Sequence, residues 1–169
     1  DIQLQDLFKP EELEMLLEKK ERYPKMKMKN QVITGLLIYQ GLLVSDIVKL
    51  TLKDIDLEEG TIYIKPGSHT NSRTLKLKSK QIILLHKYIN ETREQLIREK
   101  TESLIINQRG TREKGDGIND ITQNCRHLFP DRKINSITIR QSVIANHLKE
   151  GKDLRVVQVF AGHKTPGTT

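Results

Sequence analysis

The sequence has little of what a secreted, zinc-binding or membrane-spanning protein requires. Cys125 is the single cysteine, so no disulfide can form within the chain, and no cysteines and histidines have the spacing of a zinc finger. The first residues carry neither a basic patch nor an apolar run, and charged residues interrupt every apolar stretch before it is long enough to span a membrane. We therefore expect a cytoplasmic protein.

Several common catalytic signatures are also missing. The segment 66–69 lacks the second glycine and the lysine of a nucleotide-binding loop, no two histidines have metal-ligand spacing, and there is no Gly-x-Ser-x-Gly elbow. These absences argue against nucleotide hydrolysis, metal-assisted hydrolysis and serine-hydrolase chemistry. We expect neither a metal nor a cofactor.

What the chain does contain is typical of one basic globular domain. Its 169 residues suffice for a single hydrophobic core, and 36% of them are apolar. Lysine and arginine outnumber aspartate and glutamate by 29 to 22, which gives a net charge of +7. That surplus favours a polyanion, either nucleic acid or an acidic membrane surface, and does not by itself decide between them.

Apolar periodicity predicts a mostly helical fold with one small β-sheet. The predicted helices cover 9–17, 24–43, 45–50 with Ser45 as N-cap, 79–99, 118–128, 136–149 and 153–161. Alternation of apolar and polar residues predicts strands over 61–65 and 73–77, joined by the loop 66–72, and a further short strand over 103–106. The class is therefore α+β with a minor β element.

Arg140 interrupts the apolar stripe of its predicted helix. Ile137 precedes it by three residues, and Val143 and Ile144 follow it by three and four, which places all of them on one face. Burying a guanidinium is costly unless an anion meets it, and its planar fork suits a carboxylate or a phosphate. An internal salt bridge and a phosphate site have about equal weight here.

The predicted hairpin carries positive charge only. The segment 61–80 contains no acidic residue and five basic ones: Lys65, Arg73, Lys76, Lys78 and Lys80. A basic two-stranded ribbon can enter a DNA groove, where such side chains meet phosphates or base edges. Lysines are more commonly used to protect an exposed hairpin from aggregation, so both interpretations stay open.

His163 follows Gly162 at the end of the last predicted helix. A histidine there can hydrogen-bond a phosphate oxygen or exchange a proton near neutral pH. For a single histidine, a favourable charge at the helix C-terminus is the commoner explanation.

Four segments, 41–47 (GLLVSDI), the hairpin with Lys65, 139–148 (IRQSVIANHL) and 153–163 (DLRVVQVFAGH), resemble in this order the tyrosine recombinase, or phage-type integrase, family. The similarity runs from about Phe8 to Thr169, and the last two segments carry its most specific motifs. The catalytic domain of the family is mostly helical with a small sheet, which agrees with the predicted class.

The resemblance implies a role for each residue singled out above. Arg140 would hold the scissile phosphate of double-stranded DNA, Lys65 would protonate the leaving 5′ hydroxyl, and His163 would assist at the phosphate. In the family a tyrosine attacks the phosphodiester and forms a 3′-phosphotyrosine, so strands are exchanged without a metal or nucleotide cofactor. The expected contacts with DNA are made by Lys65, His69, Arg73, Lys76 and Lys164.

The sequence departs from the family pattern at three positions of the implied phosphate site. Leu43 stands where the family's Gly-Leu-Arg motif has its first arginine, Ile137 stands where the family has a histidine, and Gln141 replaces the histidine after the second arginine. The loop after Lys65 also differs, because Pro66 interrupts the usual Gly-Lys-Gly pattern and the loop is about one residue longer.

The resemblance also sets expectations for the whole protein. The nucleophilic tyrosine would lie a few residues beyond Thr169, and an N-terminal helical DNA-binding domain would precede this chain, so residues 1–169 form a single catalytic-type domain. We expect a monomer for this chain alone and a tetramer on DNA for the active protein, with no membrane partner. The leading hypothesis is an integrase or recombinase of a mobile element.

Two other functions remain open at this point. A DNA-binding module of the same family would have lost strand cleavage through the changes at Leu43 and Ile137. A helical protein-interaction domain with incidental positive charge would show almost no salt dependence in its affinity for DNA, unlike the other two.

Overall fold

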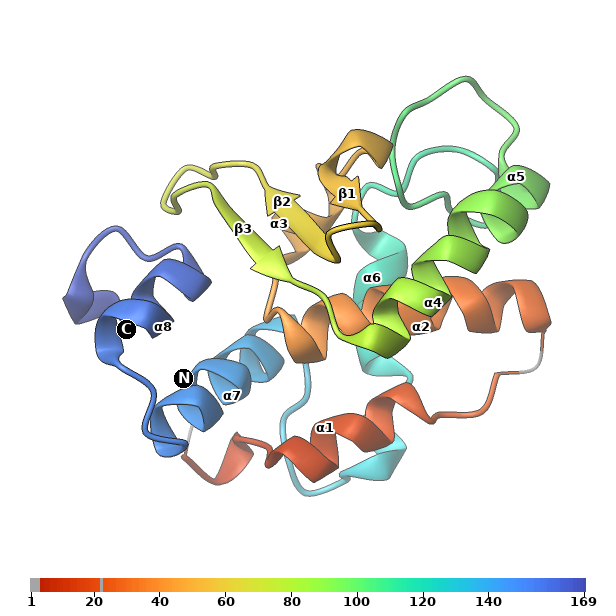
Figure 1. Cartoon of the computed structure of the whole chain (residues 1–169). Helices are drawn as coiled ribbons and strands as arrows, with labels where there is room; N and C mark the ends of the chain where they lie inside the picture. Colours follow the sequence, from red (N-terminus) through yellow and green to blue (C-terminus); the bar gives the residue numbers. More distant parts are fainter. Residues whose placement is uncertain (1–3, 22) are drawn as a thin grey trace.

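Helices form most of the domain, and a small sheet lies along one side of it (Figure 1). A computed structural model describes residues 4–21 and 23–169. The helices are α1 (Pro10–Leu17), α2 (Pro24–Tyr39), α3 (Val44–Val48), α4 (Ser79–Lys87), α5 (Arg93–Leu96), α6 (Asp116–Gln123), α7 (Ser136–Lys149) and α8 (Leu154–Ala161). The strands are β1 (Ile55–Asp56), β2 (Thr61–Ile64) and β3 (Arg73–Lys76). The predicted class is confirmed.

Helix α2 is the central element of the hydrophobic core. It packs against α1, α4, α6 and α7, and five of its apolar residues are at most 4% exposed: Val32, Ile33, Leu36, Leu37 and Ile38. A helix with neighbours on so many sides has to be apolar around most of its circumference, which explains why its hydrophobic pattern is broader than a single stripe.

The chain leaves α2 earlier than the sequence predicts. The helix ends at Tyr39 instead of Leu43, because Gly41 adopts a φ of 60°, which suits glycine. Leu43 then becomes the N-cap residue of α3 in place of Ser45, since the carboxylate of Asp46 accepts the Leu43 N–H at 2.9 Å. This correction places Leu43 in the turn between two helices and Asp46 in the first turn of α3.

The three strands form an antiparallel sheet in the order β1-β2-β3. Ile62 pairs with Leu75 and Ile64 pairs with Arg73, so these residues share the buried face, whereas Tyr63 between them is 41% exposed. The predicted hairpin is confirmed, and the two-residue strand β1 was not predicted because it is too short to show alternation.

Three further sequence predictions need correction. The helix predicted over 79–99 is divided by a π-helical turn, Tyr88–Thr92, and ends at Leu96. The strand predicted over 103–106 consists of two isolated bridges, Thr51 to Ser103 and Ile106 to Arg112. The helix predicted over 118–128 ends at Gln123 and is followed by a 3₁₀ turn.

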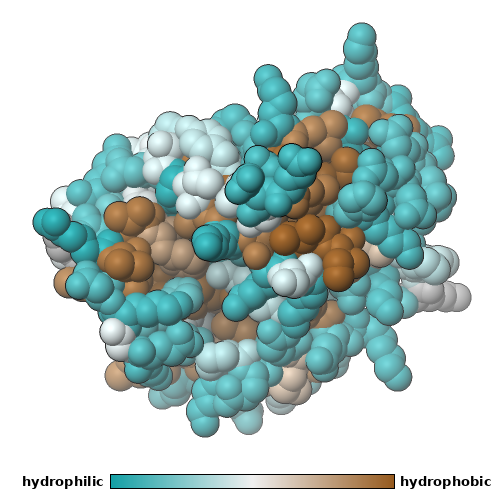
Figure 2. All heavy atoms as spheres, viewed as in Figure 1, coloured by the Kyte–Doolittle hydropathy of each residue, from teal (hydrophilic) through white to brown (hydrophobic). Residues whose placement is uncertain are grey.

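The surface is mainly hydrophilic on the face shown in Figure 2, with apolar side chains exposed in places. On α8, Leu154, Val156 and Val159 are 49%, 59% and 64% exposed. Within the described ranges 4–21 and 23–169, no helix combines the length and the apolar character that a membrane span requires.

Tyr88→Phe should lower the free energy of unfolding by about 1–3 kcal/mol. The Tyr88 hydroxyl is fully buried, donates to Leu104 O at 2.8 Å and accepts the Ile106 N–H at 3.0 Å, so its removal leaves two buried backbone groups without a partner. Urea unfolding would measure the change. The half-exposed Tyr63 provides the control, Tyr63→Phe, with an effect within about 0.5 kcal/mol; equal losses for the two variants would contradict this account.

Candidate phosphate-binding site

Arg140 lies in the second turn of α7, which begins at a well-formed cap. Asn135 Oδ1 accepts the Thr138 N–H at 2.8 Å, and Thr138 Oγ1 accepts the Asn135 N–H at 3.0 Å. The cap fixes the start of the helix and therefore the direction in which Arg140 points. The arginine is only 7% exposed, as expected for a residue on the apolar side of α7.

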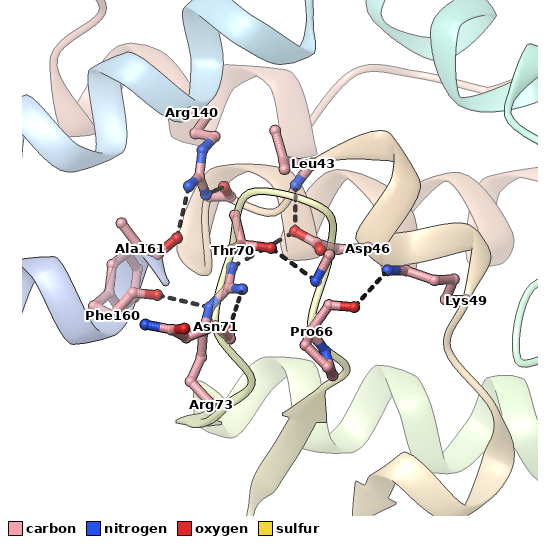
Figure 3. Close-up of polar contacts among 12 residues, drawn as sticks. Leu43, Asp46, Lys49, Pro66, Thr70, Asn71, Arg73, Arg140, Phe160 and Ala161 are labelled. Atoms are coloured by element: carbon pink, nitrogen blue, oxygen red, sulfur yellow. Dashed lines mark hydrogen bonds and ion pairs between the residues drawn. The ribbon is translucent and has the colours of Figure 1, made fainter. Parts of the chain in front are cut away.

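Two backbone carbonyls hold the guanidinium of Arg140 (Figure 3). Nη1 donates to Gly41 O at 2.8 Å, in the turn between α2 and α3, and Nη2 donates to Ala161 O at 2.6 Å, at the end of α8. Within the described part of the chain no carboxylate forms an ion pair with Arg140, so the internal salt bridge that the sequence left open is not found. A buried cation held by carbonyls keeps the capacity to bind an anion.

His163 stands beside Arg140 because α8 ends in a left-handed turn. Gly162 has a φ of 73°, and the His163 N–H donates to Gln158 O at 3.0 Å, which closes the end of the helix. This turn brings His163 Nε2 to 3.5 Å from Arg140 Nη2. On the other side of the ring, His163 Nδ1 lies 2.8 Å from Thr169 Oγ1.

The surroundings of His163 favour the neutral form of its imidazole. Burial lowers its pKa, and the positive charges of Arg140 and Arg73 lower it further. Because Arg140 can only donate, we assign Nε2 as the acceptor and place the proton on Nδ1, toward Thr169. A lowered pKa argues against the explanation that His163 serves as a positive charge at the helix C-terminus.

Arg73 points into the protein instead of toward the surface (Figure 3). It is 5% exposed, its Nε donates to Phe160 O at 3.0 Å and its Nη1 donates to Asn71 O at 3.3 Å. Its Nη2 lies 3.5 Å from the carboxylate of Asp46, and both side chains are almost completely buried. The sequence grouped Arg73 with the surface lysines because strand position alone does not reveal which face is covered.

The loop of the hairpin is attached to the end of α8. Thr70 forms an isolated bridge with His163, and the Asn71 N–H donates to Gly162 O at 2.8 Å. Thr70 is buried, whereas His69 is exposed beside it. The structure therefore brings the hairpin, α7 and α8 together around Arg140 and His163.

Lys65 lies at the base of the hairpin, apart from Arg140 and His163. Its ammonium donates to Lys49 O at 2.9 Å and forms an ion pair with Asp54. Lys49 itself donates to Pro66 O at 3.1 Å (Figure 3). The role that the resemblance implies for Lys65 stays a prediction, because the described contacts tie this side chain to the turn after α3.

The other positions singled out in the sequence lie at or near the surface. His69, Lys76 and Lys164 are exposed, as contacts with DNA would require. Ile137, which the sequence placed on the apolar stripe of α7, is 55% exposed, although Thr138 and Ile139 in the same turn are 0% and 2% exposed. Leu43 is half-buried in the turn that also provides Gly41 O.

Sequence reasoning missed the partners that give the site its shape. No pattern in the sequence assigned Asp46, Thr70 or Asn71 to the site. Their signal in the sequence is weak, since pairing between 46, 70–73 and 160–163 is a property of the folded chain. Residues 4–21 and 23–169 contain no cluster of three or more histidine, cysteine or carboxylate side chains with the geometry of a metal site.

Residues 7–169 match the sequence model of the phage integrase family. Tyrosine recombinase XerD of Oceanobacillus iheyensis is 31% identical to this chain, and the match covers 100% of the chain and 57% of XerD. Tyrosine recombinase XerC of the same organism is 30% identical over 94% of the chain and 53% of XerC. The chain thus spans a little more than half the length of these curated relatives.

Solved structures give the same picture of the fold. The XerH site-specific recombinase, in a post-cleavage complex with palindromic difH substrate, superimposes with a TM-score of 0.83 at 28% identity, over 98% of this chain and 48% of XerH. The XerA recombinase superimposes with a TM-score of 0.83 at 20% identity, over 99% of this chain and 59% of XerA, a similarity of fold alone.

Folding stability should fall as the pH drops below about 6.5, the usual pKa of an unfolded histidine. Because burial, Arg140 and Arg73 lower the pKa of folded His163, the unfolded state binds more protons in this range. The stability that neutral His163 contributes is present above about 6.5 and is lost as the pH falls toward the folded pKa.

Urea unfolding at about pH 7 and about pH 5.5 would measure this loss, which is at most about 1 kcal/mol for one histidine. His163→Gln should lose less stability than the wild type over the same interval. His147→Gln is the matched variant. Because burial also lowers the pKa of His147, this variant should likewise lose less stability than the wild type. An unchanged pH dependence in His163→Gln would contradict the prediction.

Proposed function

Because this chain belongs to the phage integrase family, we propose that it is the catalytic domain of a site-specific DNA recombinase of a mobile element. In this proposal the protein cleaves and rejoins double-stranded DNA through a 3′-phosphotyrosine. The matched relatives are tyrosine recombinases, and one solved relative is a DNA complex, which supports DNA as the partner. The tetramer on DNA and the monomeric state of this chain alone are part of the same proposal.

The observation that carries the proposal is the pairing of Arg140 with His163. Two carbonyls fix the guanidinium, and His163 Nε2 lies 3.5 Å from it at the end of α8. Neither Gly41 O nor Ala161 O neutralises the charge, so an incoming phosphodiester would be the first full anion to contact Arg140. Fixed donors of this kind stabilise the charge that develops on the phosphate oxygens without reorganising during the reaction.

The proposed step begins when a tyrosine hydroxyl attacks phosphorus. The bond between phosphorus and the 5′ oxygen breaks, the 5′ oxygen takes a proton from Lys65, and the 3′ phosphate remains bonded to the tyrosine. Arg140 would bind the non-bridging oxygens, and Nε2 of the neutral His163 would accept the proton that the tyrosine hydroxyl loses. The rejoining step reverses these transfers with a different 5′ hydroxyl, so neither a metal nor a nucleotide is consumed.

We propose that the nucleophile comes from residues that follow Thr169. Tyr39 donates to Glu14, Tyr63 is on the outer side of β2, and the Tyr88 hydroxyl is bonded to Leu104 O and Ile106 N. None of these side chains contacts Arg140 or His163 in the described part of the chain. His163 is bonded to Thr169, so the chain after Thr169 starts next to the site.

Lys65 would have to exchange its partners before it can protonate the 5′ oxygen. In this structure Asp54 neutralises its ammonium and Lys49 O accepts a hydrogen bond from it. A phosphate brought to the hairpin by DNA would compete with Asp54 for the same cation. The assignment of Lys65 therefore depends on a movement of its side chain on binding DNA.

A DNA-binding module without cleavage is the second candidate, supported by Leu43 and Ile137. Leu43 is half-buried beside Gly41 and Ile137 is 55% exposed on α7, so two apolar side chains occupy positions where the family has an arginine and a histidine. The loss of an arginine and of a polar histidine weakens the stabilisation of negative charge at phosphorus.

Covalent trapping separates the two candidates. We would incubate the protein, with the sequence that follows Thr169, with nicked suicide DNA carrying the ends of its element, and detect a denaturant-resistant protein–DNA adduct. Arg140→Ala should abolish the adduct while the chain still folds, with a free energy of unfolding lowered by about 1–3 kcal/mol because Gly41 O and Ala161 O lose their donor. Salt-sensitive DNA binding without an adduct, when an active relative gives an adduct on its own site, would favour the module that no longer cleaves.

The exposed cations should set the salt dependence of DNA binding. Lys76→Gln and Lys164→Gln should each reduce the slope of log K against log salt by about 1, since each lysine would release counterions from a phosphate. Lys87→Gln on α4 removes the same charge from an exposed position that is not part of the proposed surface. Fluorescence anisotropy at several salt concentrations would measure the slopes, and a slope near zero for the wild type would support a protein-interaction domain instead.

A further inference from the structure

The last carbonyls of α8 are held by two arginines from other elements. Arg73 Nε donates to Phe160 O at 3.0 Å, and Arg140 Nη2 donates to Ala161 O at 2.6 Å. Carbonyls in the last turn of a helix have no partner within the helix and take one from elsewhere. Here the two partners are cations on β3 and α7, and the next two residues along the chain are Gly162 and His163.

The guanidinium of Arg73 is packed directly against Gly162. A Cβ at position 162 would lie 2.6 Å from Arg73 Nη1 and 3.0 Å from Asn71 O, so a side chain has no room there. Arg73 also donates to Asn71 O at 3.3 Å, and Asn71 returns to α8 by donating its N–H to Gly162 O at 2.8 Å. The turn that carries His163 is therefore bonded to β3 by both backbone and side chain.

Asp46 holds Arg73 from the opposite side. Its carboxylate lies 3.5 Å from Arg73 Nη2 and accepts the Leu43 N–H at 2.9 Å, within the turn that provides Gly41 O to Arg140. Asp46 Oδ1 and Arg73 Nη2 are buried and have no hydrogen-bond partner among the described residues. A buried ion pair with incomplete hydrogen bonding is a poor source of stability, so its position is better explained by the order it imposes on its neighbours.

These contacts form a closed circuit around the site. Arg140 donates to Gly41 O, and the chain leads from Gly41 to Asp46, which pairs with Arg73. Arg73 donates to Phe160 O at the end of α8, and the next carbonyl, Ala161 O, accepts from Arg140. Every connection in the circuit involves a charged side chain or a backbone carbonyl. A shift of Arg73 would therefore change the position of the α8 end relative to Arg140.

We propose that Arg73, held by Asp46, is a positioning residue that fixes His163 relative to Arg140 for the reaction at the phosphate. The inference rests on the proposed function. Arg73 itself is too deeply buried to contact the phosphate, and it acts through Phe160 O, Asn71 O and Gly162. Its charge has a second effect, since it contributes to the low pKa of His163 and so keeps the imidazole neutral.

Two substitutions separate the geometry from the charge. Arg73→Lys keeps the positive charge but loses the planar fork that bonds Phe160 O and Asn71 O together, and Arg73→Gln loses both. If Arg73 positions the site, both variants should form the covalent DNA adduct about 10- to 100-fold more slowly than the wild type. Lys87→Gln removes an exposed charge on α4 and should leave the rate unchanged.

The pKa of His163 distinguishes the two variants, because it responds to the charge at position 73. Measured by NMR titration of the histidine ring, it should rise in Arg73→Gln and stay near the wild-type value in Arg73→Lys. Amide hydrogen exchange at Gly162 and His163 should accelerate in both variants. If Arg73→Lys forms the adduct and exchanges the Gly162 and His163 amides at the wild-type rates, the proposal is overturned. Arg73 would then have a charge effect alone.

A failure of the positioning proposal for Arg73 can be distinguished from a failure of the proposed function. If the wild-type protein forms no adduct, the proposed function fails, while the exchange rates and the change in His163 chemical shift on adding inorganic phosphate still report whether Arg73 orders the site. If the Arg73 variants do not fold, Asp46→Asn replaces them, because its carboxamide can still accept the Leu43 N–H. Faster exchange at Gly162 in Asp46→Asn is expected, and wild-type exchange would overturn the proposal.

Discussion

The geometry of the site depends on the two hydrogen bonds that hold the Arg140 guanidinium between Gly41 O and Ala161 O. They join α7 to the turn after α2 and to the end of α8, three segments that are far apart in the sequence. A salt bridge in the same place would have neutralised the cation. Carbonyl oxygens orient the guanidinium and leave its charge available, which is the condition that a phosphate site imposes on a buried arginine.

The need for carbonyl partners at Arg140 also bears on the end of α8. Gly162 adopts a φ of 73°, closes the helix and directs His163 back toward α7. The carbonyls exposed by this ending are used by Arg73 and Arg140, so the end of one helix becomes the point at which three elements are fixed. The end of α8 is also packed on α7 through a small hydrophobic cluster separate from the main core, formed by Ile144, Val157 and Ala161.

The basic residues of strand β3 lie on both of its faces. The period of two along β3 places Arg73 on the buried face and Lys76 on the exposed one. The inward side chain orders the site, while the outward lysine is free to face a polyanion. One strand of four residues thus links the proposed DNA surface to the proposed phosphate site.

Periodicity and short motifs are local properties of the chain, and they were sufficient to predict the helical class, the hairpin and the family and to single out Arg140 and His163 as candidates. The folded structure was needed to show that Arg73 faces inward and pairs with Asp46, that Lys65 forms an ion pair with Asp54 and that Ile137 is exposed. The division has a physical reason. Which face of a strand or helix turn is covered, and which charge meets which, depends on segments that the chain brings together only when it folds.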